Sequence, residues 1–227
     1  MNENEIEASI AACEADLAAG RKIDVKGHRF WKAVAAVKAD DSLTTRYADR
    51  IGVIDHAAFE NWALYTVPAS TGTTLMALAT IAGLAIILAG YYVDDPWNGI
   101  ALVLGTGVLL VSTHGLAHMT VGRLQGMQFS NWFIGTISRP QPGVKIAYAS
   151  YLHTPPRSRA WMHASGAIVT KLLPFLLLGA AYGMDAPAWS WWVLIILGIA
   201  QILTDVLWST KASDWKKYRR EMKYVSA

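Results

Sequence analysis

The feature of this sequence that most constrains its fold is a set of four apolar segments of similar length. They cover about residues 70–92, 97–119, 163–182 and 189–208. No lysine or arginine lies between Arg50 and Arg123 or between Lys171 and Lys211. A helix needs about 20 apolar residues to cross a hydrocarbon core of about 30 Å. The sequence therefore predicts an all-α polytopic membrane protein with four transmembrane helices, in preference to a soluble bundle of apolar helices.

The charges between the segments predict an orientation. The two short turns that join the paired segments contain Asp94, Asp95 and Asp185 and no basic residue. Basic residues collect instead in the long connection that includes Arg123 and after Lys211. Since basic loops stay on the cytoplasmic side, we expect both termini to be cytoplasmic in an inner or cytoplasmic membrane.

Three regions follow from this reading. Residues 1–62 are polar and helix-prone, and they predict a soluble helical N-terminal segment. Residues 63–208 form the membrane core, including an insert at 122–160. The turn signal Arg139–Gly143 and the alternation at residues 144–148 predict a small cytoplasmic-side β-hairpin or loop in that insert. Residues 209–227 predict a basic amphipathic tail on an anionic lipid surface.

The predicted partner of these basic residues is the lipid bilayer. The basic cluster after Lys211 is short and directly follows a predicted span, where an excess of positive charge is expected on the cytoplasmic side. The sequence gives no separate indication of nucleic-acid binding.

Three ionisable residues within the predicted spans form a candidate site. His114 and His118 are four residues apart near the end of the second span, and Asp205 lies near the same end of the fourth. Residues at i and i+4 share one face of a helix. Ionisable groups inside a bilayer are costly and generally functional. We therefore predict a metal site formed by these three residues, with zinc as the ion, since two imidazoles and one carboxylate suit zinc.

Other interpretations of these residues stay open at this stage. The histidines and the aspartate could simply form hydrogen bonds between helices. Haem ligation is a further alternative, although no attachment motif exists and two histidines on one face do not sandwich a haem. A membrane di-iron oxygenase also uses His-x-x-x-His spacing but needs more histidines. The lone cysteine, Cys13, excludes a multi-cysteine site.

The order of these motifs resembles the site-two protease family of intramembrane zinc metalloproteases. That family has a His-Glu-x-x-His helix, then a polar insert with β structure, a span that begins with small residues, and a span that carries Leu-Asp-Gly. Here the corresponding stretches are His114–His118, Ala164–Thr170 and Leu203–Val206. The resemblance covers about residues 102–208 and implies metal binding by His114, His118 and Asp205, with a transmembrane or membrane-adjacent peptide as partner.

The sequence departs from that family at the general base. Gly115 stands where the family has its catalytic glutamate, and Ala167, Thr170 and Val206 replace three further motif residues. A positioned base contributes about 10²–10⁴-fold in rate. The resemblance therefore implies a membrane metalloprotein with weakened or absent peptide hydrolysis. The alternative is a non-enzymatic membrane scaffold or assembly factor that binds another transmembrane segment.

Two residues of the third span are candidate substitutes for the missing base. Lys171 could polarise a substrate carbonyl or donate to Asp205, and its other interpretation is a lysine that reaches the membrane interface. His163 could act as a base or as a fourth ligand, or form an interfacial hydrogen bond. Asp214 is close to Asp205 in sequence, but we expect it to lie beyond the membrane.

Overall fold

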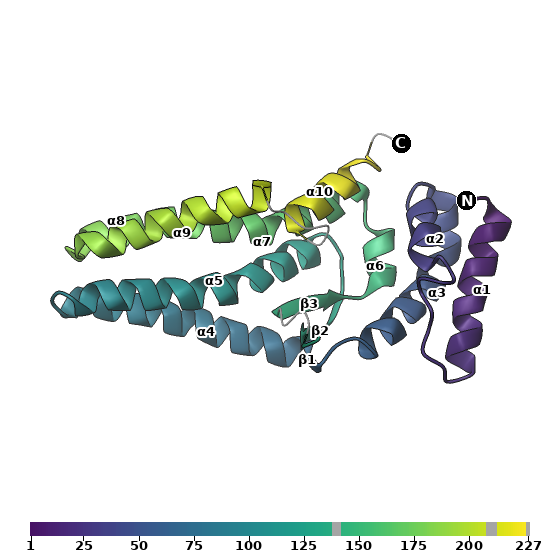
Figure 1. Ribbon diagram of the computed structural model, residues 1–227, viewed down its shortest axis with the longest axis horizontal. Coiled ribbons are helices and arrows are strands. Elements are labelled where there is room, and N and C mark those ends of the chain that lie inside the picture. Colours follow the sequence, from purple (N-terminus) through teal and green to yellow (C-terminus); the bar gives the residue numbers. More distant parts are fainter. Residues whose placement is uncertain (138–141, 208–212, 226–227) are drawn as a thin grey trace. The chain divides into compact units, whose positions relative to one another are not determined.

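A computed structural model of the chain describes residues 1–137, 142–207 and 213–225. It is mostly helical with one small sheet, which confirms the predicted fold class (Figure 1). In chain order the elements are α1 (Glu3–Ala18), α2 (Phe30–Val37), α3 (Asp41–Glu60), β1 (Tyr65–Pro68), α4 (Ala69–Ala89), the 3-10 helix η1 (Gly90–Tyr92), α5 (Trp97–Leu124), β2 (Phe129–Ile134), β3 (Pro142–Ile146), α6 (Tyr148–His153), α7 (Pro156–Leu176), α8 (Leu178–Gly183), α9 (Ala188–Leu207) and α10 (Asp214–Met222).

Four helical segments are long and apolar enough to cross a membrane. They are Ala69–Tyr92, Trp97–Leu124, Pro156–Gly183 and Ala188–Asp205. Each overlaps one of the four predicted spans, and the second and third extend beyond their predicted bounds at the ends that flank the insert. These segments indicate an integral membrane protein.

The chain divides into two compact units. The first contains residues 1–69, 122–159 and 222–227, and the second contains residues 70–121 and 160–221. This division differs from the predicted boundary after residue 62, because the N-terminal segment and the insert share one unit. The physical reason is strand pairing, since β1 follows α3 and pairs with β2 of the insert.

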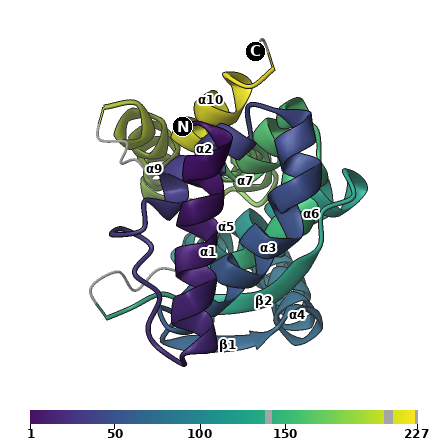
Figure 2. The same ribbon diagram turned by 90° about the vertical axis from the view of Figure 1, so that its right-hand side faces the viewer.

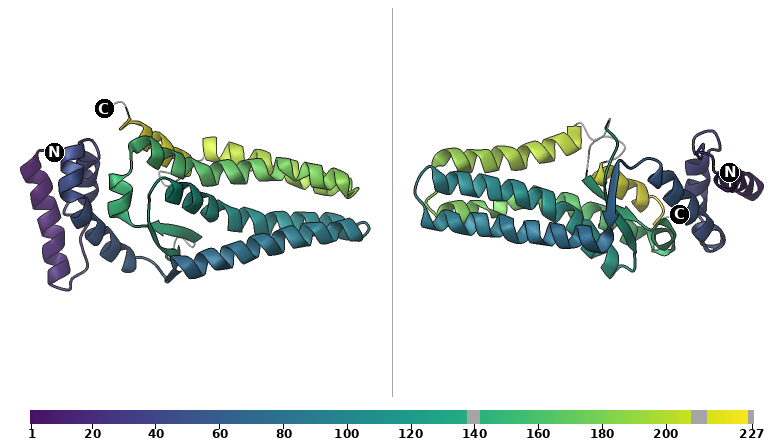
Figure 3. Two further views of the ribbon diagram at one scale, coloured as in Figure 1. Left: turned by 180° about the vertical axis from the view of Figure 1, so that it is seen from behind. Right: turned by 90° about the horizontal axis from the view of Figure 1, so that it is seen from below.

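The second unit is a bundle in which small residues bring helices close together. In Figures 1 and 3, α4 runs beside α5. A Cβ atom added at Gly105 of α5 would lie 2.7 Å from the carbonyl oxygen of Gly83 in α4. Such contacts are typical of membrane helices, where backbones approach through glycine and alanine. At the turn end of the bundle, the Asn98 side chain donates to the carbonyl oxygen of Met184 at 3.1 Å.

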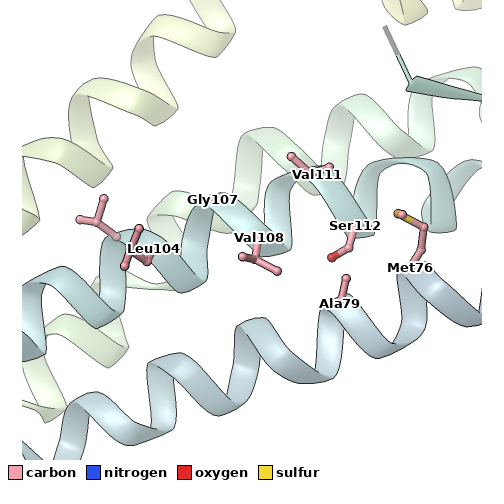
Figure 4. A pocket seen from close by; sticks show the side chains of 8 residues that line it. Met76, Ala79, Leu104, Gly107, Val108, Val111 and Ser112 are labelled. Atoms are coloured by element: carbon pink, nitrogen blue, oxygen red, sulfur yellow. The ribbon is translucent and has the colours of Figure 1, made fainter. Parts of the chain in front are cut away.

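An apolar groove lies along α4 and α5. Its volume is about 500 Å³, and its lining includes Met76 and Ala79 of α4 together with Gly107, Val111 and Ser112 of α5 (Figure 4). The hydroxyl of Ser112 accepts a hydrogen bond from Thr80 at 2.9 Å. The polar group in the groove therefore already has a protein partner, and the remaining surface is hydrocarbon.

The first unit combines a helical core with the sheet. Figure 2 shows the helices α1, α2 and α3 of this unit. Their side chains form its core, which includes Ile6, Ile10, Phe30 and Ile51. The sheet order is β1-β2-β3, and both pairings are antiparallel. The predicted hairpin strands are therefore present as β2 and β3, with a third strand that comes from before the first span. Residues 139–141 of the predicted turn lie outside the described residues.

A buried ion pair joins the N-terminal helices to the insert inside this unit. The Lys145 ammonium of β3 contacts the Asp55 carboxylate of α3, and the same ammonium lies 4.8 Å from the centroid of the Phe59 ring. Burial raises the pKa of Asp55, and the positive charge of Lys145 offsets part of that increase. The pair therefore tolerates burial only while both partners are present.

We predict that Lys145→Met destabilises the protein by about 3–5 kcal/mol, because it leaves the Asp55 carboxylate buried without its cation. The double variant Asp55→Leu/Lys145→Met should recover most of that loss. Chemical denaturation in detergent measures both values. If the double variant is as unstable as Lys145→Met, the loss does not come from an unpaired buried Asp55 carboxylate. The ion pair itself then stabilises the fold.

Candidate metal centre

Helix α5 places two imidazoles side by side at one end of the bundle. The His114 and His118 rings are edge to face, with centroids 4.7 Å apart, and their Nε2 atoms are separated by 3.3 Å. This arrangement follows directly from the i, i+4 spacing on a helix. The sequence thus correctly predicted that these two nitrogens could serve one ion.

The third group is Asp214, the first residue of α10. Its Oδ2 lies 3.2 Å from His114 Nε2 and 3.1 Å from His118 Nε2. Within the described part of the chain, these three residues form the group of ligand-type side chains that could hold a metal ion. Zinc ligands at about 2.0 Å in tetrahedral geometry are about 3.3 Å from one another. The three atoms therefore have the spacing of one face of a zinc tetrahedron.

A hydrogen bond fixes the orientation of the His118 ring. Its Nδ1 lies 2.7 Å from the backbone carbonyl oxygen of Met162 in α7. A carbonyl oxygen only accepts, so Nδ1 carries the proton and donates it. In the neutral ring the lone pair of Nε2 then points toward His114 and Asp214. Metal-binding histidines are generally held in this way by a second partner on the other ring nitrogen.

Gly166 allows α7 to approach this ring. A Cβ atom added there would lie 2.4 Å from His118 Nε2 and 2.9 Å from the backbone oxygen of His114. No side chain fits in that space without moving the imidazole. Gly166 is therefore a positioning residue of the centre, and the sequence identified it only as part of a small-residue stretch.

The electrostatics favour an ionised carboxylate at Asp214. Burial raises its pKa, but the His114 and His118 imidazoles, which donate from Nε2 when that atom carries a proton, and the nearby positive charge of Lys217 outweigh burial and lower the pKa well below the usual range. The Lys217 ammonium lies 3.0 Å from Oδ1. The first turn of a helix also favours negative charge. The group thus combines a charged oxygen with two imidazole nitrogens.

Access to the three groups is unequal. The His118 and Asp214 side chains are 10% and 14% exposed, whereas that of His114 is 40% exposed. The centre is therefore closed on the side of α7 and open on the side of His114. A small molecule such as water could reach a fourth coordination position from that side.

The structure places Asp205 beside Lys171, which is one of the alternatives predicted from the sequence for that lysine, and not beside the histidines. Its Oδ2 lies 2.8 Å from the Lys171 ammonium, so the two residues form an ion pair between α9 and α7. The predicted third ligand was Asp205, but the carboxylate beside the histidines is that of Asp214. The physical reason is charge compensation, since a lone aspartate within a span costs about 3 kcal/mol and Lys171 supplies the opposite charge.

The two weaker candidates lie outside the triad. Lys171 is engaged with Asp205 and also lies 3.5 Å from the carbonyl oxygen of Ala167. His163 is half-buried in α7, directly after Met162, whose carbonyl orients His118. The structure therefore brings together the histidine pair and Asp214, and it does not bring Lys171 or His163 into that group.

Asp214 is the residue of this group that the sequence did not predict as a ligand. It lies outside the spans, as expected, yet α10 places its carboxylate beside α5. The sequence signal near Asp214 is Ser213, a residue type that often precedes a helix. In the structure the Ser213 hydroxyl accepts a hydrogen bond from the backbone N–H of Lys216 at 3.4 Å. Comparisons of the chain with family models, with curated proteins and with solved structures found no match.

We predict that Gly166→Ala lowers the metal affinity of the centre by tenfold or more, because the added methyl group collides with His118. Changes to groups that orient metal ligands typically cost about 10–100-fold. Cobalt(II) absorption during titration of the detergent-solubilised protein measures this affinity. Gly107→Ala is the matched control, since a Cβ atom there meets nothing within 4 Å. Equal affinities for the two variants would contradict the role of Gly166.

Proposed function

We propose that this chain is an integral membrane metalloprotein that binds one zinc ion through His114, His118 and Asp214, with weak or absent peptide hydrolysis. The observation that carries the proposal is the convergence of three ligand atoms at 3.1–3.3 Å. The hydrogen bond from His118 to Met162 supports it, because that bond directs the free lone pair at the centre.

The donor set favours zinc over the other common ions. Magnesium and calcium prefer six or more oxygen ligands, whereas two imidazoles and a carboxylate with one open position match zinc sites. Zinc bound in this way lowers the pKa of a coordinated water to about 7. The exposed side of His114 gives water a route to that position.

Hydrolysis is expected to be weak because a glycine occupies the position at which the resembling family has its general base. Gly115, between the two histidines, is buried and has no side chain to accept a proton. The order of motifs resembles the site-two proteases, and the proposed substrate or partner is accordingly a transmembrane or membrane-adjacent peptide. That resemblance concerns the histidine pair and the small-residue stretch at Gly166, whereas the carboxylate comes from another position.

The second candidate function is a non-enzymatic scaffold or assembly factor in the membrane. The glycine at position 115 favours it, because a fold that retains its ligands but lacks its base can still bind a partner segment. In both cases the acidic turns and the basic connections favour the orientation with both termini in the cytoplasm.

Metal analysis of the purified protein tests the centre. We expect about one zinc ion per chain in the wild type and loss of that ion in His118→Ala and in Asp214→Ala, because two remaining ligands hold zinc poorly. The matched control is the double variant Lys171→Met/Asp205→Leu. It removes the other aspartate together with its cation, and it should retain the ion.

Two outcomes would contradict this assignment. A folded wild type without bound metal under zinc-replete conditions would remove the centre. Loss of zinc in the Lys171→Met/Asp205→Leu variant but not in Asp214→Ala would instead identify Asp205 as the ligand.

Replacement of Gly115 tests the catalytic part of the proposal. We expect Gly115→Glu to raise cleavage of a membrane-adjacent model peptide by about 10²–10⁴-fold over wild type, since it supplies a general base beside the ion. Gly115→Gln has the same size without the base and should not raise the rate. If the wild type already cleaves as fast as the Glu variant, its hydrolysis is not impaired.

A further inference from the structure

The helix that supplies the third ligand also carries a basic surface. Lys216, Arg219 and Arg220 of α10 are exposed, whereas Asp214 and Glu221 are turned inward. At 3.6 residues per turn, the centre of these three basic positions lies about 180° from Asp214 around the helix axis. We call Lys216, Arg219 and Arg220 the basic stripe. One helix therefore connects the metal centre on one side to a positive surface on the other.

The aromatic residues of α10 are half-buried and contact each other and helix α7. Trp215 and Tyr218 stack with ring centroids 5.1 Å apart, and Tyr218 lies edge to face on Trp161 of α7 at 5.6 Å. The basic stripe is more exposed than these rings, and it is the charged surface that α10 offers to a partner.

The contacts of α10 place it at the boundary of the hydrocarbon region. Helix α5 has 28 residues and is therefore about 42 Å long, which exceeds a hydrocarbon core of about 30 Å. If the hydrocarbon core of the bilayer begins at the level of Trp97, it ends about 20 residues further along α5, near His118. Since α10 meets α5 at His118, we expect its stripe to lie at the level of the lipid headgroups.

We propose that anionic lipid headgroups bind the basic stripe and that this binding and zinc binding strengthen each other. The inference rests on the proposed zinc site. Charge complementarity selects the partner, because clusters of lysine and arginine at this level attract anionic phospholipid. Lipid that holds α10 against the membrane keeps Asp214 beside the histidines. By linkage, the ion must then favour lipid binding by the same factor.

The test compares zinc affinity in two kinds of lipid nanodisc. One contains only phosphatidylcholine, and the other contains in addition about one third phosphatidylserine. We expect the wild type to bind zinc at least fivefold more tightly in the anionic discs, as measured by competition with a chromophoric chelator. The anionic surface also concentrates zinc by itself, so the result depends on comparison with variants that experience the same surface.

The informative variant is Lys216→Gln/Arg219→Gln/Arg220→Gln, which removes the stripe without changing a ligand. For this variant, the ratio of zinc affinity in anionic discs to zinc affinity in phosphatidylcholine discs should be less than half the ratio measured for the wild type. The matched control is Lys22→Gln/Lys26→Gln/Lys32→Gln, which removes three exposed lysines of the first unit and should behave as the wild type. High salt should weaken the lipid effect in the wild type.

The outcomes separate the two proposals. Zinc binding with the same lipid dependence in the wild type and the stripe variant overturns the coupling and leaves the zinc site intact. A wild type that binds no zinc in either disc overturns both. A wild type whose zinc affinity rises when nucleic acid or an acidic peptide is added, but does not rise in the anionic discs, would show that the stripe serves another partner, which also overturns the inference.

Discussion

The candidate centre depends on one close contact between two helices, that of α7 on α5 at Gly166. The missing side chain lets the backbone of α7 reach the His118 ring, and the Met162 carbonyl then fixes that ring by a hydrogen bond of 2.7 Å. Without this contact the imidazole would be free to turn, and its lone pair would have no defined direction. Asp214 can complete the group only because both histidine nitrogens are already directed at one point.

Charge compensation explains how two aspartates near the same bundle end differ in role. Asp205 lies at the end of a candidate span, and Lys171 neutralises it at 2.8 Å. Asp214 lies outside the spans and is surrounded by two imidazoles and the Lys217 ammonium. Both carboxylates thus satisfy the rule that buried charge needs a partner. The rule itself does not say which carboxylate pairs with a lysine and which lies beside the two histidines.

In the first unit too, local sequence signals predicted some elements and not the contacts between distant segments. The turn and the alternating residues of the insert were sufficient to predict a hairpin, since both signals are local. The third strand was not predictable in this way, because β1 is a four-residue segment directly before a span. Its pairing with β2 and the Asp55–Lys145 contact link residues that are far apart in the chain. Tertiary contacts of this kind have no local period.

The sequence by itself determined the four apolar helices, their short acidic turns and the pair of histidines on one face, because hydropathy and helical periodicity depend only on residues near one another. The tertiary structure alone decided which carboxylate meets that pair. His118 and Asp214 are 96 positions apart, and their contact depends on how α10 returns to α5 after the last span. It also decided that a glycine positions the ring, since a close approach of two backbones is a property of packed helices and not of either segment alone.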